Sequence, residues 1–310
     1  MIFSKESLIQ SMSGASCFSV LQMLLLVILG AVLMTNQHYH QLLGNDIKRS
    51  GGGLVFTGVM YLLTTGLGIC SARTLNKFLM LLQFIVLATL IFFQSMFGFV
   101  LLGKTVATYS STEKLSCLSF GAYETMAAVN RSRCDEFFLS DEYAGITLVW
   151  ESYIVAAASD GNARAMLLNL QKDNVCCGNG LPLHCFDDTR AFPTSHPAPM
   201  LLQQRIKCSD KNGIFYLATK DCSKYGRCEY DFPSGTCGQN PVTSSTRGCG
   251  SFVFDDLNSQ VRAIAVVALA FITFPITFLI FSLCLCFKRR DEDVLPPIEF
   301  VSKAKIHANG

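Results

Sequence analysis

Four long apolar runs constrain this chain more than any other feature of its sequence. They lie at residues 17–34, 54–71, 78–102 and 261–287, in a chain of 310 residues that is 50% hydrophobic and only 15% charged. About 20 apolar residues in a helix cross the hydrocarbon core of a bilayer, and in lipid only a helix satisfies the hydrogen bonds of its own backbone. The sequence therefore predicts an all-α integral membrane protein with a four-helix transmembrane bundle.

Two local features add to this prediction. Pro275 lies inside the fourth run and predicts a kink there, because proline removes a backbone hydrogen bond from a helix. Gly51-Gly52-Gly53 precedes the second run and predicts a flexible segment.

Basic residues beside the runs predict the side of the membrane on which each connection lies. Lys5, Arg73, Lys77 and Lys288-Arg289-Arg290 all fall on one side, and an excess of Lys and Arg in short connections marks the cytoplasmic side. The predicted cytoplasmic segments are 1–16, 72–77 and 288–310. The predicted outer segments are a small loop at 35–53 and a large loop at 103–260. We expect both termini in the cytoplasm, in a plasma, endosomal or other vesicular membrane.

The first run could instead be a cleaved signal peptide, because Lys5 precedes it. Its length, and the absence of a cleavage pattern at Leu29-Gly30-Ala31, favour a transmembrane span.

The fourteen cysteines form two groups. Ten lie in the large loop, which we place in an oxidising compartment, and their even number predicts disulfides. They contain no CxxC motif, which argues against a zinc ribbon or a thioredoxin-type site. Their connectivity cannot be derived from the sequence. These residues are Cys117, Cys134, Cys176, Cys177, Cys185, Cys208, Cys222, Cys228, Cys237 and Cys249.

The other four cysteines, Cys17, Cys70, Cys284 and Cys286, lie at the predicted cytoplasmic ends of the spans. Cysteines next to a membrane are candidates for S-palmitoylation. The alternative is that they are small apolar filler. Their shared position at one interface favours acylation.

Within the large loop, Cys176-Cys177-Gly178 is the most specific motif. Adjacent Cα atoms lie about 3.8 Å apart, whereas bridged cysteines need about 4.4–6.8 Å, so the two cysteines should bond to separate partners. Helical spacing of apolar residues predicts one or two helices over about 141–175, ending at this motif, with Trp150 in the core. We also expect a helix near 104–130.

From 179 to 235 the chain is rich in proline, glycine and cysteine, which predicts a loop-rich, disulfide-linked head. Asn130-Arg131-Ser132 is an N-glycosylation sequon on the predicted outer side, so Asn130 is a candidate glycosylation site.

The runs contain few polar residues. Gln22 and Gln83 are candidates for hydrogen bonds between spans, worth about 0.6–2 kcal/mol each. The alternative is that they face lipid headgroups. Because charged or repeated polar positions are almost absent, a pore of the channel or junction class is disfavoured.

Together these features resemble the tetraspanin family over nearly the whole chain. The resemblance rests on the four spans, the Cys176-Cys177-Gly178 triplet, Gly248-Cys249 before the last span, Leu67-Gly68-Ile69-Cys70, and Cys284-Leu285-Cys286 before a basic tail. It implies that the triplet cysteines bridge to downstream cysteines, of which Cys249 matches one, and Cys185 or Cys237 the other. The loop is longer and richer in cysteine than is usual in the family.

The resemblance implies a membrane organiser that binds partner membrane proteins laterally, clusters with copies of itself and performs no catalysis. We expect the recognition surface in the head at 179–235, and a lipid or sterol between the spans is kept open as a further partner. A rim or curvature protein is the alternative. The formal charge of +2 gives no argument for nucleic acid. His184 beside Cys185, and His38 with His40, lack the further groups that an enzyme or metal site needs, so no cofactor is expected.

Overall fold

The computed structural model describes residues 5–74, 76–119, 127–174, 176, 178–179, 222–223, 227–228 and 247–294. Packing divides the chain into two units. The span unit comprises Met1–Ile28, Val55–Ser95 and Ala270–Gly310, and the loop unit comprises Leu29–Leu54 and Met96–Leu269. Helices α1, α3 and α4 each contribute residues to both units.

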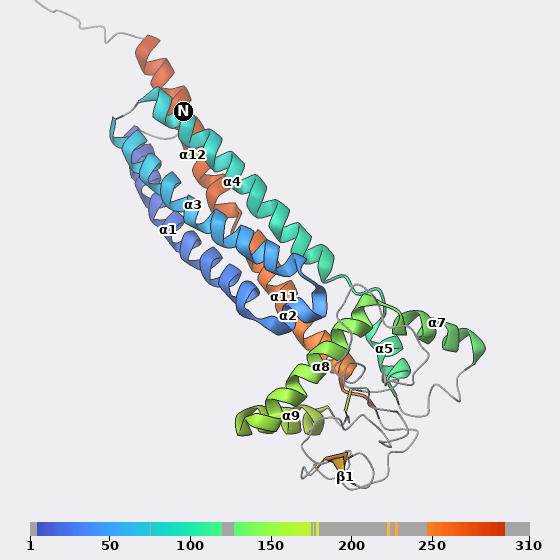
Figure 1. The fold of residues 1–310 in the computed structure, drawn as a ribbon. Helices are drawn as coiled ribbons and strands as arrows, with labels where there is room; N and C mark the ends of the chain where they lie inside the picture. The colour runs from blue at the N-terminus through green and yellow to red at the C-terminus, as the bar shows by residue number, and fades with distance from the viewer. Residues whose placement is uncertain are drawn as a thin grey trace, which may run out of the picture. The chain divides into compact units, whose positions relative to one another are not determined.

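The long helices are α1 (Lys5–Thr35), α3 (Asp46–Thr74), α4 (Lys77–Lys104), α11 (Gly250–Ala270) and α12 (Thr273–Val294) (Figure 1). Among the described residues, four segments are long and apolar enough to cross a membrane: Phe18–Thr35, Asp46–Ser71, Phe78–Lys104 and Gly250–Cys284. Large apolar side chains are exposed along them, among them Ile28, Phe56, Leu63, Phe92 and Phe99. In a bilayer such side chains contact lipid or neighbouring proteins.

The kink predicted at Pro275 stays a prediction, but the helix breaks close to this residue. The helix is interrupted at residues 271–272, between α11 and α12. Proline has no N–H to donate to the carbonyl of Phe271 one turn earlier. That carbonyl instead accepts a hydrogen bond from the backbone N–H of Phe274 at 3.3 Å.

The predicted flexible segment at Gly51-Gly52-Gly53 is wrong, because all three glycines lie inside α3. The missing side chains permit close helix packing. A Cβ on Gly51 would lie 2.9 Å from the carbonyl oxygen of Gly30, and a Cβ on Gly53 would overlap the ring of Phe97. Ahead of α3, Asn36 caps a short helix, α2 (Gln37–Leu43), which ends at Gly44 with φ 86°.

The predicted helix near 104–130 is also wrong. Helix α4 ends at Lys104, and α5 (Ser111–Cys117) and α7 (Ala128–Phe138) follow separately. A capping box starts α5: Ser110 Oγ accepts from the Glu113 N–H at 3.2 Å, and the Ser110 N–H donates to Glu113 Oε2 at 2.8 Å. In a continuous helix the same two N–H groups would donate to carbonyls one turn earlier. Here they bond to side chains instead, and a new helix begins.

Two helices over about 141–175 are confirmed as α8 (Asp141–Ser159) and α9 (Gly161–Asp173). Every residue of α8 from Tyr143 to Trp150 is buried. Trp150 is 3% exposed, as expected of a core residue. Helix α8 packs against α2 and α9, and its Tyr143 ring meets the ring of Phe137 from α7 at 5.6 Å. Helix α8 is therefore the centre of the loop unit.

A short antiparallel ladder joins β1 (Cys222–Ser223) to β2 (Arg227–Cys228), with Cys222 opposite Cys228. The sequence did not predict it. The rest of the predicted head beyond Asn179, like the tail after 294, lies outside the described residues.

Candidate interaction site

Cys176, Gly178 and Asn179 are tied to the start of α11 by a disulfide and two backbone hydrogen bonds. Cys176 is bonded to Cys249, with Cα atoms 5.1 Å apart. The N–H of Cys249 donates to the Gly178 carbonyl at 2.8 Å, and the N–H of Gly250 donates to the Asn179 carbonyl at 3.0 Å. We call this set of three links the clamp. Gly178 has φ 58°, a left-handed conformation that favours glycine.

Asn179 and Gly250 complete the clamp from inside. Asn179 is 0% exposed, and its Nδ2 donates to Thr147 Oγ1 of α8 at 3.4 Å. A Cβ on Gly250 would lie 2.6 Å from Ile146 Cγ2 and 2.7 Å from Asn179 Oδ1, so only glycine fits there without movement. Gly248 and Cys249 were expected from the sequence to lie at this site, whereas Gly250 was not. The run Gly248-Cys249-Gly250 was the signal that could have revealed it.

The ten predicted disulfide cysteines are only partly described. Besides the clamp disulfide, Cys117 of α5 is bonded to Cys134 of α7. Cys249 is the partner that the resemblance implied for one cysteine of the triplet. No side chain is described for the remaining six, so their disulfides stay a prediction: Cys177, Cys185, Cys208, Cys222, Cys228 and Cys237.

A buried cation lies where α5, α8 and α11 meet. The Lys114 side chain is 0% exposed, and its Nζ lies 3.6 Å from Glu142 Oε2 and 3.7 Å from Asp255 Oδ1. Nζ is also 3.6 Å from the centroid of the Phe254 ring. Burial lowers the pKa of Lys114, and the two carboxylates partly oppose that shift. No sequence pattern indicated that Lys114 would be buried.

Helix α2 docks on α8 through close backbone packing and side-chain hydrogen bonds. Gly145 faces the backbone of Leu42, which leaves no room for a Cβ. His38 Nδ1 lies 3.0 Å from Ser152 Oγ. Tyr39 donates to Gln260 Oε1 of α11 at 2.7 Å. His40 Nε2 lies 2.6 Å from the Leu33 carbonyl, so the two histidines serve separate contacts.

Within the span unit, polar side chains link the helices. Gln22 of α1 donates to Gln94 Oε1 of α4 at 2.9 Å, and Tyr61 of α3 donates to the same oxygen at 2.9 Å. Gln83 Oε1 accepts from Ser71 at 2.7 Å, and its Nε2 donates to Ser282 of α12 at 3.4 Å. Gln22 and Gln83 thus take part in hydrogen bonds between helices. Gln94, which joins α1, α3 and α4, was not predicted from the sequence to link helices.

The modification sites remain predictions. Cys70 and Cys284 are exposed free thiols, as an acylated cysteine must be, whereas the side chains of Cys17 and Cys286 lie outside the description. Asn130 is exposed in the first turn of α7.

Four apolar helices with a disulfide-linked helical loop unit define a class: multi-pass integral membrane proteins with a large structured loop between the last two spans. A family model described as Tetraspanin family matches residues 10–288. The chain belongs to the tetraspanin family. Members of this family are generally non-enzymatic, and membership suggests a membrane-organising role. A search of curated proteins finds no match.

Proposed function

We propose that this protein organises membrane proteins laterally, with both termini in the cytoplasm and the loop unit outside or in a lumen. Partner membrane proteins bind the head at 179–235, and palmitoylated spans cluster copies of the chain. The clamp is the observation that carries this proposal. It holds both ends of the segment that contains the head, at Gly178–Asn179 and at Cys249–Gly250, against helix α8.

A clamped segment is suited to recognition for an entropic reason. The Cys176–Cys249 disulfide closes a sequence separation of 73 residues. In the chain-entropy treatment, closing a loop of that length reduces the conformational entropy of the unfolded chain. This raises the free energy of the unfolded state by about 4.4 kcal/mol. Fixing the ends in the folded state reduces the ordering that partner binding must supply, while the segment between them can vary in sequence.

Replacement of the head tests the recognition step. Residues 181–246 are exchanged for a short Gly-Ser linker, with Cys177→Ser to avoid an unpaired thiol. The ends can be joined this way because the Asn179 carbonyl and the Gly250 N–H are hydrogen-bonded at 3.0 Å. Proximity labelling from the loop unit should then lose its partner proteins, while surface expression and the Cys176–Cys249 bond persist. Asn162→Ala, on the exposed start of α9, is the matched control. Unchanged labelling in the linker variant contradicts recognition by the head.

Serine replacement of Cys17, Cys70, Cys284 and Cys286 tests the clustering step. We expect a folded protein that disperses in the membrane, measured by single-particle tracking. Clusters of unchanged size would refute acylation as their cause. Because Cys70 and Cys284 are exposed free thiols, a membrane-impermeant maleimide tests orientation. After hydroxylamine treatment it should label them only in permeabilised cells.

A further inference from the structure

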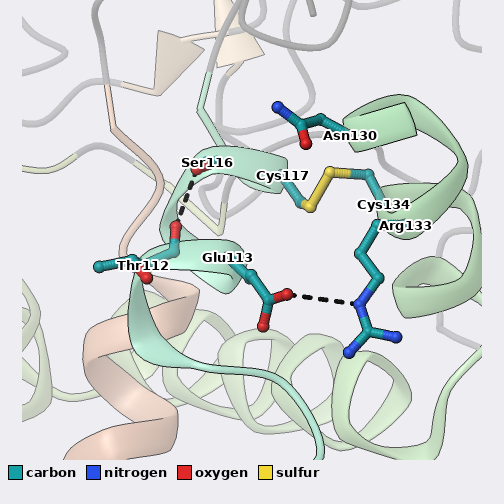
Figure 2. Close-up of a pocket in the computed structure, with 7 residues that line it drawn as sticks. All are labelled: Thr112, Glu113, Ser116, Cys117, Asn130, Arg133 and Cys134. Atoms are coloured by element: carbon teal, nitrogen blue, oxygen red, sulfur yellow. Dashed lines mark hydrogen bonds and ion pairs between the residues drawn. A yellow bond between two sulfur atoms is a disulfide. The ribbon is translucent and has the colours of Figure 1, made fainter. Parts of the chain in front are cut away.

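A polar pocket lies between α5 and α7, and the Cys117–Cys134 disulfide joins its two walls (Figure 2). Its volume is about 210 Å³, the scale of one sugar ring rather than a chain of them. Seven residues line it: Thr112, Glu113, Ser116, Cys117, Asn130, Arg133 and Cys134.

The pocket offers hydrogen-bonding groups that are already held in place. Arg133 Nε donates to Glu113 Oε1 at 3.3 Å, Arg133 Nη1 lies 3.5 Å from Glu136 Oε2, and the guanidinium lies 4.9 Å from the centroid of the Tyr109 ring. A hydrogen bond from the Ser110 N–H lowers the pKa of Glu113, so its carboxylate is ionised at neutral pH. Arg133 is a fixed hydrogen-bond donor and Glu113 is a fixed acceptor beside it. A neutral ligand with hydroxyl and amide groups can bond to both, because such groups donate and accept.

Asn130 connects this pocket to a ligand. It is the acceptor of the Asn130-Arg131-Ser132 sequon and also forms part of the pocket wall. Arg133 and Cys134 follow it by three and four residues, so all three share one face of α7. Figure 2 shows the Asn130 amide on one side of the disulfide and the Glu113–Arg133 pair on the other. In Figure 2 the amide oxygen of Asn130 faces the disulfide and the nitrogen faces away, so a rotation of this exposed side chain would bring a sugar on Nδ2 to the edge of the pocket.

We propose that the pocket holds the first N-acetylglucosamine of an N-linked glycan on Asn130. The bond forms between Asn130 Nδ2, which loses a proton, and the anomeric carbon of an oligosaccharide donor, which loses its polyprenyl pyrophosphate. The acetamide of the sugar bonds to Arg133, its hydroxyls bond to Glu113, Thr112 and Ser116, and its ring covers the disulfide. The glycan thereby ties α5 to α7 independently of the disulfide. This proposal rests on the outer orientation of the loop unit proposed above.

Trimming the glycan in two ways tests the proposal. The full-length glycoprotein in detergent is treated with an endoglycosidase that leaves one N-acetylglucosamine, or with an amidase that removes every sugar and converts the Asn130 amide to a carboxylate. Ser132→Ala gives a sugar-free form without that new charge. The single-sugar form should keep the Tm of the intact glycoprotein and the hydrogen-exchange protection of α5 and α7. The sugar-free form, and Ser132→Ala, should fall by about 2–4 °C.

Two variants separate pocket binding from a general effect of glycosylation. Arg133→Ala should abolish the difference between single-sugar and sugar-free forms. Arg164→Thr in the Ser132→Ala background moves the sequon to Asn162, in the first turn of α9, where one sugar should give no such protection. The proposal is overturned if peptide mapping finds Asn130 bare, if one sugar and none give equal Tm values, or if Arg133→Ala leaves the difference intact. None of these readouts depends on partner labelling or clustering, so the two proposals fail separately.

Discussion

Gly250→Ala is the sharpest test of the clamp. Gly250 opens α11, and its N–H donates to the Asn179 carbonyl at 3.0 Å. An added Cβ would lie 2.6 Å from Ile146 Cγ2, 2.7 Å from Asn179 Oδ1 and 2.9 Å from the Asn179 carbonyl oxygen, where ordinary contacts begin at 3.4 Å. One of these atoms belongs to the backbone that the clamp itself holds, so side-chain rotation alone cannot relieve the overlap.

The expected cost follows from these contacts. Overpacking of a filled core costs about 1–3 kcal/mol. Lengthening the Gly250–Asn179 hydrogen bond adds about 1 kcal/mol. We therefore expect Gly250→Ala to lower the free energy of unfolding by about 2–4 kcal/mol. That change corresponds to a fall in Tm of about 4–16 °C for a domain of this size, at about 2–4 °C per kcal/mol.

Trp150 provides the assay, because it is the only tryptophan in the chain and is 3% exposed in α8. Its fluorescence reports unfolding of the loop unit in detergent micelles. Gly161→Ala is the matched control: Gly161 also opens a helix, and a Cβ there meets nothing within 4 Å. It should leave Tm unchanged or raise it slightly. Equal Tm values for the two alanine variants would refute the close packing inferred at Gly250.

Four further predictions follow from the contacts. Gly145→Ala should push α2 off α8, because the Cβ would overlap the Leu42 backbone; hydrogen exchange of α2 should rise while α9 stays protected. Gln94→Leu leaves the Gln22 amide and the Tyr61 hydroxyl without their shared acceptor and should cost about 1–3 kcal/mol in SDS unfolding; a change smaller than that of Tyr61→Phe alone contradicts the network. Glu142→Ala removes one of the two carboxylates described beside the buried Lys114 cation and leaves Asp255 and the Phe254 ring; it should lower the free energy of unfolding by about 3 kcal/mol, measured by Trp150 fluorescence. Burial lowers the pKa of His38 below 6.5, so the unfolded chain binds the proton first and the loop unit should lose stability as the pH falls below about 6.5; a His38→Gln protein with the same pH profile as the parent would exclude His38 as the cause.

The features that the sequence could predict are those set by composition or by a single residue. The spans follow from apolar length, which the bilayer fixes. The interruption before Pro275 follows from one missing N–H. That Cys176 bonds to a distant cysteine, Cys249, and not to its neighbour Cys177 follows from the distance between adjacent Cα atoms.

The features that it missed depend on residues far apart in the chain. A run of glycines considered alone predicts flexibility. Gly51 and Gly53 nevertheless lie in α3, where the lack of a side chain lets other helices pack closely against them. From sequence alone Lys114 would be placed on the surface. The carboxylates that pair with it, Glu142 and Asp255, are 28 and 141 positions away in the chain. The break between α4 and α5 was local, but apolar periodicity concealed the Ser110–Glu113 capping box.

The contacts also suggest where variation in this loop is tolerated. The clamp, the Lys114 cluster and the α2–α8 contact all use α8 or residues that pack on it. We expect each to be sensitive to a single methyl group or a single charge. The segment between Asn179 and Cys249 enters and leaves through adjacent hydrogen bonds, so changes in its length need not move α8. We therefore expect substitutions in α8 to alter folding, and substitutions in the clamped segment to alter the choice of partner.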